Sequence, residues 1–133
     1  MKRPKILIAD DHTLVAEACK NLLEREFDVV GVVPDGRALL QAASELRPDV
    51  VIADIELPQL NGLDAGEQLK QKYREIKLIF LTMNVRPDLP AEAFHSGASA
   101  YVVKHCTAED LIVAVRRVVK GGRIYPRRSA KKL

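Results

Sequence analysis

The sequence predicts one α/β domain in which helices cover both faces of a parallel β-sheet. Short apolar runs alternate five times with segments whose apolar residues recur at helical spacing. Within the runs, apolar residues do not alternate with polar ones, which is typical of strands buried on both faces. Alternating strands and helices connect through right-handed crossovers into a parallel sheet. We therefore expect a doubly wound, flavodoxin-like (βα)5 fold with strand order 2-1-3-4-5.

Each expected element follows from its own stretch of sequence. The apolar runs predict strands over Lys5–Ala9, Val29–Val33, Val50–Ala53, Lys77–Leu81 and Ala100–Val103. Helical spacing predicts helices over Leu14–Leu23, Ala38–Leu46, Gly62–Tyr73, Pro90–His95 and Ala108–Lys120. Turn signals support the boundaries. Pro48, for example, ends the second helix because the residue before a proline is disfavoured in the helical region.

Length and composition fit one folded domain followed by a short tail. The chain has 133 residues, of which 47% are hydrophobic and 5% aromatic, so an aliphatic core is expected. Residues 116–132 carry eight basic and no acidic side chains, and removing those eight charges from the net +3 leaves about −5. We expect a domain over residues 1–120 and a basic tail over 121–133, which starts a linker. A basic tail is also able to contact nucleic acid.

Several classes of protein are disfavoured by the remaining composition. Cys19 and Cys106 have no C-x-x-C spacing, which gives no indication of a zinc site or a disulfide framework. Only four apolar residues, 6–9, follow the charged N-terminus, which is too short for a signal peptide. No run approaches the roughly 18 apolar residues of a membrane span. A cytoplasmic location without membrane contact is expected.

Polar residues follow four of the five strands, at positions that a parallel sheet brings to one edge. They are Asp10 and Asp11, Asp54, Thr82 and Lys104. In the 2-1-3 order the first and third strands are neighbours, so three carboxylates with a formal charge of −3 gather there. Lys104 supplies +1 and a divalent cation supplies +2. Oxygen ligands with room for water suit Mg²⁺ better than Zn²⁺.

The same set of residues is suited to phosphoryl transfer. A metal, a lysine and a hydroxyl group can together neutralise and bind phosphoryl oxygens. The sequence contains no Gly-rich phosphate loop and no Ser/His/Asp or Cys/His set. A carboxylate remains as the covalent acceptor, and Asp54 is the best candidate. The alternative is a metal-dependent phosphatase with an aspartate nucleophile, although such a nucleophile usually ends the first strand.

These residues resemble the receiver domain of bacterial two-component response regulators. The resemblance covers about residues 4–120, and the output segment of such regulators would lie outside this chain. Each motif is weak by itself, but together at the right strand ends they are specific. The matching features are Asp10-Asp11, Asp54 with L-P-x-x-N-G at Leu57–Gly62, Thr82, Gly97-Ala98, Tyr101 and Lys104.

The resemblance implies a chemical role for each residue of the site. Asp54 accepts a phosphoryl group from the phosphohistidine of a sensor histidine kinase, and Thr82 and Lys104 bind that group. The domain promotes its own phosphorylation and dephosphorylation, and it is not otherwise an enzyme. The implied Mg²⁺ ligands are Asp11, Asp54 and the backbone carbonyl of Glu56, with Asp10 acting through water.

The resemblance also implies a switch and an output. Thr82 moves toward the phosphoryl group and Tyr101 turns inward behind it. The opening D-D-H-T-L-V and the pair Gly121-Gly122 are similar to the NarL/FixJ-like subfamily, whose output is a LuxR-type helix-turn-helix domain. The implied partners are the kinase, a second copy in a phosphorylation-dependent homodimer, and DNA through an output domain that this chain lacks.

Some positions depart from the family pattern or receive no role. His105 follows the lysine where many members have proline, Met83 follows Thr82 where a small residue is usual, and the loop 84–90 contains two prolines. These departures affect the expected reaction rates of the site and the expected amplitude of the conformational switch. The histidines, His12 among them, have no metal-like spacing, so they are assigned no chemistry. A pseudo-receiver that binds partners without accepting phosphate is the remaining alternative.

Overall fold

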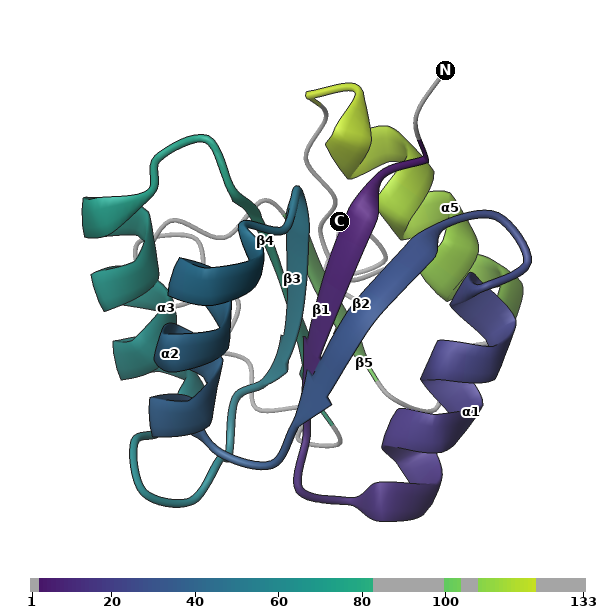
Figure 1. The fold of residues 1–133 in the computed structure, drawn as a ribbon. Helices are drawn as coiled ribbons and strands as arrows, with labels where there is room; N and C mark the ends of the chain where they lie inside the picture. The colour runs from purple at the N-terminus through teal and green to yellow at the C-terminus, as the bar shows by residue number, and fades with distance from the viewer. Residues whose placement is uncertain (1–2, 83–99, 104–107, 122–133) are drawn as a thin grey trace, which may run out of the picture.

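A computed structural model describes residues 3–82, 100–103 and 108–121 of the chain (Figure 1). For Thr82, for residues 100–103 and for residues 108 and 109, the description is limited to the backbone. The strands are β1 (Lys5–Ala9), β2 (Asp28–Val33), β3 (Val50–Asp54), β4 (Lys77–Thr82) and β5 (Ala100–Val103). The helices are α1 (Thr13–Leu23), α2 (Gly36–Leu46), α3 (Gly62–Lys72) and α5 (Ala108–Val119).

The strands form one parallel sheet in the order β2-β1-β3-β4-β5. The predicted alternation and the predicted order of the first four strands are confirmed, and β5 extends the sheet next to β4. The helix expected over residues 90–95 lies outside the described residues, so the full count of five βα units stays a prediction. In the described ranges, none of the helices combines the length and apolarity that crossing a bilayer requires.

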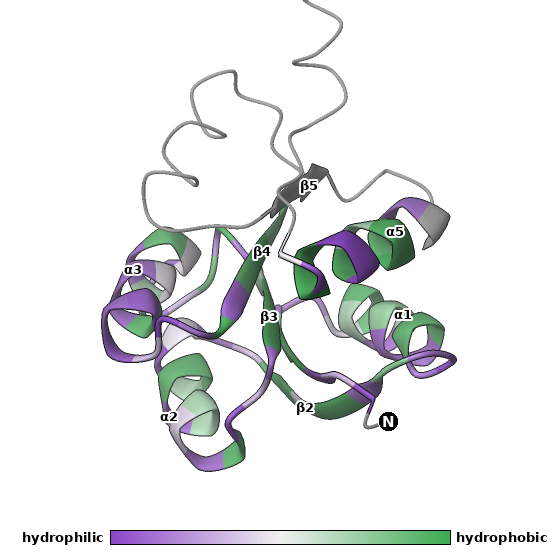
Figure 2. Ribbon diagram, turned by 90° about the horizontal axis from the view of Figure 1, so that it is seen from above, coloured by the Kyte–Doolittle hydropathy of each residue, from purple (hydrophilic) through white to green (hydrophobic). Residues whose placement is uncertain are grey.

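Two helical layers enclose the sheet. Helices α2 and α3 pack on one face and α1 and α5 on the other, as the two sides of Figure 1 show. Alternate residues of each central strand enter different cores: Leu7 and Ala9 of β1 lie with α2 and α3, while Ile6 and Ile8 lie with α5 and the end of α1. Both sets are almost fully buried. Burial on both faces explains why the strands read as unbroken apolar runs, which appear green in Figure 2.

Helices α2 and α3 begin at side chains that bind their first backbone N–H groups. The Asp35 carboxylate accepts the N–H of Ala38 at 2.8 Å, and the Asn61 amide oxygen accepts the N–H of Asp64 at 2.9 Å. Because Asp35 is the cap, α2 begins at residue 36, two residues before the predicted start. Helix α2 ends at Arg47, whose left-handed φ of 47° directs the chain away just before Pro48.

Candidate functional site

The carboxyl ends of β1 and β3 carry the charged site. The strands run side by side with Ala9 paired to Ala53, so the next residues, Asp10 and Asp54, lie at one edge of the sheet. These two are the buried charged residues of the part of the chain whose burial is described, at 5% and 3% exposure. Asp11 is more exposed, at the start of the turn that leads to α1. We call Asp10, Asp11 and Asp54 the acidic cluster.

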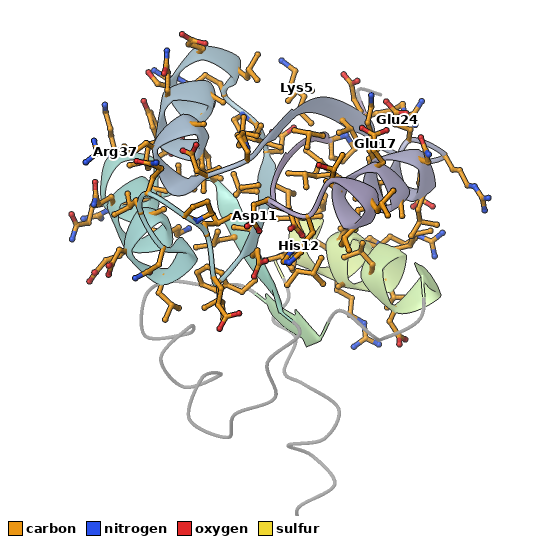
Figure 3. The ribbon with its side chains drawn as sticks, turned by 90° about the horizontal axis from the view of Figure 1, so that it is seen from below. Lys5, Asp11, His12, Glu17, Glu24 and Arg37 are labelled. Carbon is orange, nitrogen blue, oxygen red and sulfur yellow. The ribbon has the colours of Figure 1, made fainter. Side chains whose placement is uncertain are left out.

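His12 joins the acidic cluster, which the sequence interpretation did not foresee. Its Nδ1 atom lies 3.0 Å from Oδ1 of Asp10, 3.3 Å from Oδ1 of Asp11 and 3.6 Å from Oδ2 of Asp54. Figure 3, which looks onto this edge, places Asp11 and His12 close together beside α1. One ligand atom from each of the four residues falls within 4.8 Å of the others. The sequence analysis assigned His12 no chemistry on grounds of spacing, whereas the structure places its ring among these carboxylates.

The turn after β1 fixes Asp10 and aims His12 at the cluster. Oδ1 of Asp10 accepts the backbone N–H of His12 at 2.8 Å, and the N–H of Asp10 donates to the carbonyl of Val33 at 3.0 Å. His12 occupies the N-cap position of α1 with an extended backbone, yet its side chain makes no capping hydrogen bond. The ring is directed to the carboxylates instead. The N-cap residue of α1 is therefore His12 and neither Asp10 nor Asp11.

The loop after β3 holds Asp54 from the other side. Oδ1 of Asp54 accepts the backbone N–H of Glu56 at 3.0 Å, and the N–H of Gly62 donates to the carbonyl of Ile55 at 2.7 Å. Gly62 approaches so closely that a Cβ atom there would lie 2.1 Å from the carbonyl oxygen of Asp54. Only glycine fits this contact, which explains the Asn61-Gly62 pair: the first residue caps α3 and the second packs on β3.

The remaining predicted site residues are placed only in part. Thr82 ends β4, and its backbone lies one step beyond the pairing of Asp54 with Leu81, so it reaches the same edge. Tyr101 lies in β5 opposite Phe80. Lys104, Met83 and His105 fall outside the described residues, although β5 ends at the residue before Lys104. Their predicted roles, and that of the Glu56 carbonyl, stay predictions.

The chemistry of the acidic cluster suits a divalent cation. Two of its carboxylates are buried, and burying a carboxylate is costly unless a counter-charge or hydrogen bonds compensate. The turns supply one backbone N–H each to Asp10 and Asp54. Carboxylate oxygens from two strands, with an exposed side open to water, are the type of donor that Mg²⁺ prefers. The cluster therefore has the donor set and spacing that could hold a divalent cation.

Comparison with known proteins agrees with this geometry. Residues 6–116 match the family described as the response regulator receiver domain. This chain belongs to that family. It is 36% identical over 126 residues to the transcriptional regulatory protein DegU of Brevibacillus brevis, an alignment that covers 92% of the chain and 53% of DegU. It is 32% identical over 131 residues to the response regulator GacA of Pseudomonas aeruginosa, covering 97% of the chain and 61% of GacA.

Solved receiver structures are also similar to this receiver domain. A LuxR-family two-component response regulator from Aurantimonas sp. SI85-9A1 superposes with a TM-score of 0.92 at 28% identity, covering 98% of this chain and 94% of that one. The isolated receiver domain of RcsB from Salmonella enterica, determined with the phosphomimetic BeF₃⁻, gives 0.90 at 26% identity and covers 99% of both chains. The chain spans between half and two thirds of the length of these curated relatives.

Proposed function

We propose that this receiver domain is a phosphorylation switch in which Asp54 accepts a phosphoryl group from a sensor histidine kinase. A carboxylate oxygen of Asp54 forms a bond to phosphorus while the bond from phosphorus to the kinase imidazole breaks, and the imidazole leaves with a proton. The position of Asp54 carries this proposal. It is 3% exposed at the tip of a central strand, inside a set of carboxylates that fits a divalent cation.

The contacts around Asp54 support this proposal, because they orient its carboxylate. Its Oδ1 atom is held by the N–H of Glu56, and its Oδ2 atom faces the exposed side where His12 lies. A phosphoryl donor would approach from that side. The backbone of Gly62 packs directly against the backbone of Asp54 and helps to hold it in place. These contacts orient the acceptor before any partner binds.

We assign Mg²⁺ to Asp11, Asp54 and the backbone carbonyl of Glu56, with Asp10 acting through a water molecule. When bound, Mg²⁺ would neutralise charge on the cluster and on the transferred oxygens. We further propose that Thr82 and Lys104 contact the phosphoryl group, because β4 and β5 end at the edge that carries Asp54. Tyr101, on β5, would then follow the movement of Thr82 as the second switch residue.

The proposed output extends beyond this chain. DegU and GacA are longer than this chain, which covers 53% of the first and 61% of the second. We therefore propose that residues 121–133 begin a linker to a LuxR-type DNA-binding domain, and that DNA contact belongs to that domain. Phosphorylation-dependent pairing of two receiver copies would couple Asp54 to the output. The fifth βα unit, with a helix over residues 90–95, is part of the same proposal.

Intact mass measurement tests the acceptor and the metal together. Wild type and Asp54→Asn are incubated with a small phosphodonor, each with and without Mg²⁺. A mass gain of one phosphoryl group in wild type alone, dependent on Mg²⁺, is expected. Glu17→Gln, which removes an exposed carboxylate on α1 away from the cluster, serves as the matched control and should gain the same mass. Absence of a gain in every sample would favour a pseudo-receiver.

A further inference from the structure

The ring of His12 lies where a metal ligand would lie. Its Nδ1 atom is 3.0 to 3.6 Å from one oxygen of each carboxylate in the acidic cluster. Although His12 is the N-cap residue of α1, its side chain makes no hydrogen bond to the first turn of the helix. The side chain is 57% exposed, so the ring turns toward the cluster although solvent is open to it.

The distances match those between neighbouring ligands of a single ion. With metal–ligand bonds of about 2.1 Å, two ligands at a right angle are about 3.0 Å apart, and two tetrahedral ligands are about 3.4 Å apart. The three measured separations from Nδ1 are 3.0, 3.3 and 3.6 Å. Ligands on opposite sides of an octahedral ion are about 4.2 Å apart. In this structure the four candidate donor atoms all lie within 4.8 Å of one another. One ion can therefore be reached by Nδ1 and the carboxylates with small adjustments.

An imidazole changes which ions such a site prefers. Mg²⁺ is a hard cation that takes oxygen ligands and water, whereas imidazole nitrogen suits Ni²⁺, Cu²⁺ and Zn²⁺. Replacing one water or oxygen ligand with nitrogen should strengthen binding of these ions far more than binding of Mg²⁺. The backbone N–H of His12 is already anchored on Asp10, so the ring reaches the cluster without ordering a further segment.

We propose that His12 is a nitrogen ligand of the divalent-cation site and gives it a preference for borderline transition ions over Mg²⁺. The inference rests on the metal site proposed above and adds a ligand to it. The alternative is that Nδ1 keeps its 3.0 Å hydrogen bond to Oδ1 of Asp10 and binds no ion. That contact opposes every cation alike, because any incoming ion must displace the ring. The two readings therefore predict opposite effects of removing His12 on Ni²⁺ binding.

Calorimetric titration with Ni²⁺ and with Mg²⁺ separates these readings. The chain has three histidines, so the parent protein is compared with a His95→Gln, His105→Gln background in which His12 is the single imidazole. In both, His12→Ala should weaken Ni²⁺ binding by roughly tenfold or more and should change Mg²⁺ binding much less. His12→Asn, which offers oxygen in place of nitrogen, should likewise lower the ratio of Ni²⁺ to Mg²⁺ affinity.

Proton NMR with paramagnetic Ni²⁺ provides a second readout that does not depend on affinity. Strongly shifted imidazole signals should appear in the single-histidine background and should be missing after His12→Ala. Thermal unfolding without metal shows that each variant is folded. Unchanged or tighter Ni²⁺ binding in His12→Ala would overturn the inference.

Asp11→Asn distinguishes failure of this inference from failure of the metal site itself. If Asp11→Asn abolishes binding of both ions while His12→Ala leaves Ni²⁺ affinity intact, the metal site stands and the histidine ligand is wrong. If neither substitution affects either ion, the cations bind elsewhere and both proposals fail. Weakened Ni²⁺ binding in both variants supports the nitrogen ligand at the proposed site.

Discussion

The two ends of the sheet handle charge in opposite ways. At the carboxyl end, three carboxylates of like sign gather around one imidazole. At the amino end, opposite charges meet: Arg116 of α5 forms two hydrogen bonds of 2.6 Å with the carboxylate of Glu26. Arg3 binds the backbone carbonyls of Glu24, Glu26 and Phe27 in the same turn between α1 and β2. The amino end thus pairs opposite charges, whereas the carboxyl end gathers like charges.

This contrast shows which end of the sheet has an arrangement of charges that costs folding free energy. At the amino end, oppositely charged groups pair on the surface. Each such pair stabilises the fold only slightly and does not destabilise it. At the carboxyl end, like charges lie close together and are partly buried. The fold itself does not require this arrangement. In parallel α/β sheets, ligands bind outside the carboxyl ends of the strands, which is where these buried carboxylates gather. Substitutions at the two ends should therefore differ in kind as well as in size.

The largest effect is expected for Gly62→Ala at the carboxyl end. The new Cβ would lie 2.1 Å from a carbonyl oxygen and 2.8 Å from the Cα of Ile55, and backbone atoms cannot rotate away. The free energy of unfolding should fall by on the order of 3 kcal/mol, and phosphoryl uptake at Asp54 should drop as the loop shifts. Chemical denaturation measures the first effect and intact mass the second.

Gly31→Ala is the matched control for that experiment. Its Cβ would meet two leucine side-chain carbons at 3.2 Å, and such atoms can move by a few tenths of an ångström. A loss well below that of Gly62→Ala is expected. Equal losses would show that the Gly62 contact with Asp54 has no special weight.

The next effect concerns Mg²⁺. A ligand that binds only the folded state stabilises it, and a tenfold excess over the dissociation constant adds about 1.4 kcal/mol. Wild type should gain this amount, while Asp11→Asn should gain much less because the cluster loses one of its three negative charges. Thermal unfolding with and without Mg²⁺ measures the difference. If Glu17→Gln lost the gain equally, the effect would be general screening.

A smaller, pH-dependent effect is expected at the amino end. The hydrogen bond from Arg116, helped by the charges of Arg116 and Arg3, lowers the pKa of Glu26 below its ordinary 4.5. A carboxylate with a lowered folded-state pKa stabilises the protein above the unfolded value, and the contribution disappears as the pH falls through the folded pKa. Arg116 remains charged throughout, because the same contact raises its pKa.

Arg116→Gln should therefore lower Tm slightly at pH 7, and this effect should disappear as the pH falls through the folded-state pKa of Glu26. Arg117→Gln, the exposed neighbour on α5, is the control and should show no such pH dependence. Melting curves over this range test the pair. A Tm difference between wild type and Arg116→Gln that stays constant with pH would contradict the assigned cause.

The smallest structural effect is expected for Glu56→Ala. The side chain is exposed, so unfolding free energy should change by no more than about 0.5 kcal/mol. We expect the phosphorylated form to decay faster, because the Glu56 charge repels attacking water next to Asp54. The decay of the phosphorylated mass over time measures this. An unchanged lifetime with unchanged stability would remove Glu56 from the site.

The sequence was most informative where one physical rule acts alone. Strands buried on both faces must be apolar throughout, so β1, β3 and β4 were predicted to within one residue. The strand order then placed Asp10 and Asp54 side by side, because parallel strands end at a common edge. The roles of Thr82, Tyr101 and Lys104 rest on the family resemblance and stay predictions.

The sequence was least informative where contacts join distant turns. The position of His12 in the acidic cluster was not predicted, because the spacing of residues within one segment carries no information about a cluster that two strands share. The register of β1 against β3, combined with the side chain after Asp11, is the signal that could have found it. The pair of Glu26 and Arg116 spans 90 residues, and no local pattern marks it. Surface ion pairs of this type depend on the final docking of α5.

The pairing of β1 with β3 has a kinetic consequence. It joins residues 44 positions apart, with β2 and two helices between them, and contacts of such separation form late and slowly. That same step brings the acidic cluster together, so electrostatic repulsion grows as the folding nucleus closes. A divalent cation would then accelerate refolding itself, whereas a ligand that binds only after closure would merely retard unfolding. The rate at which the acidic cluster first forms would then depend on the concentration of the divalent cation.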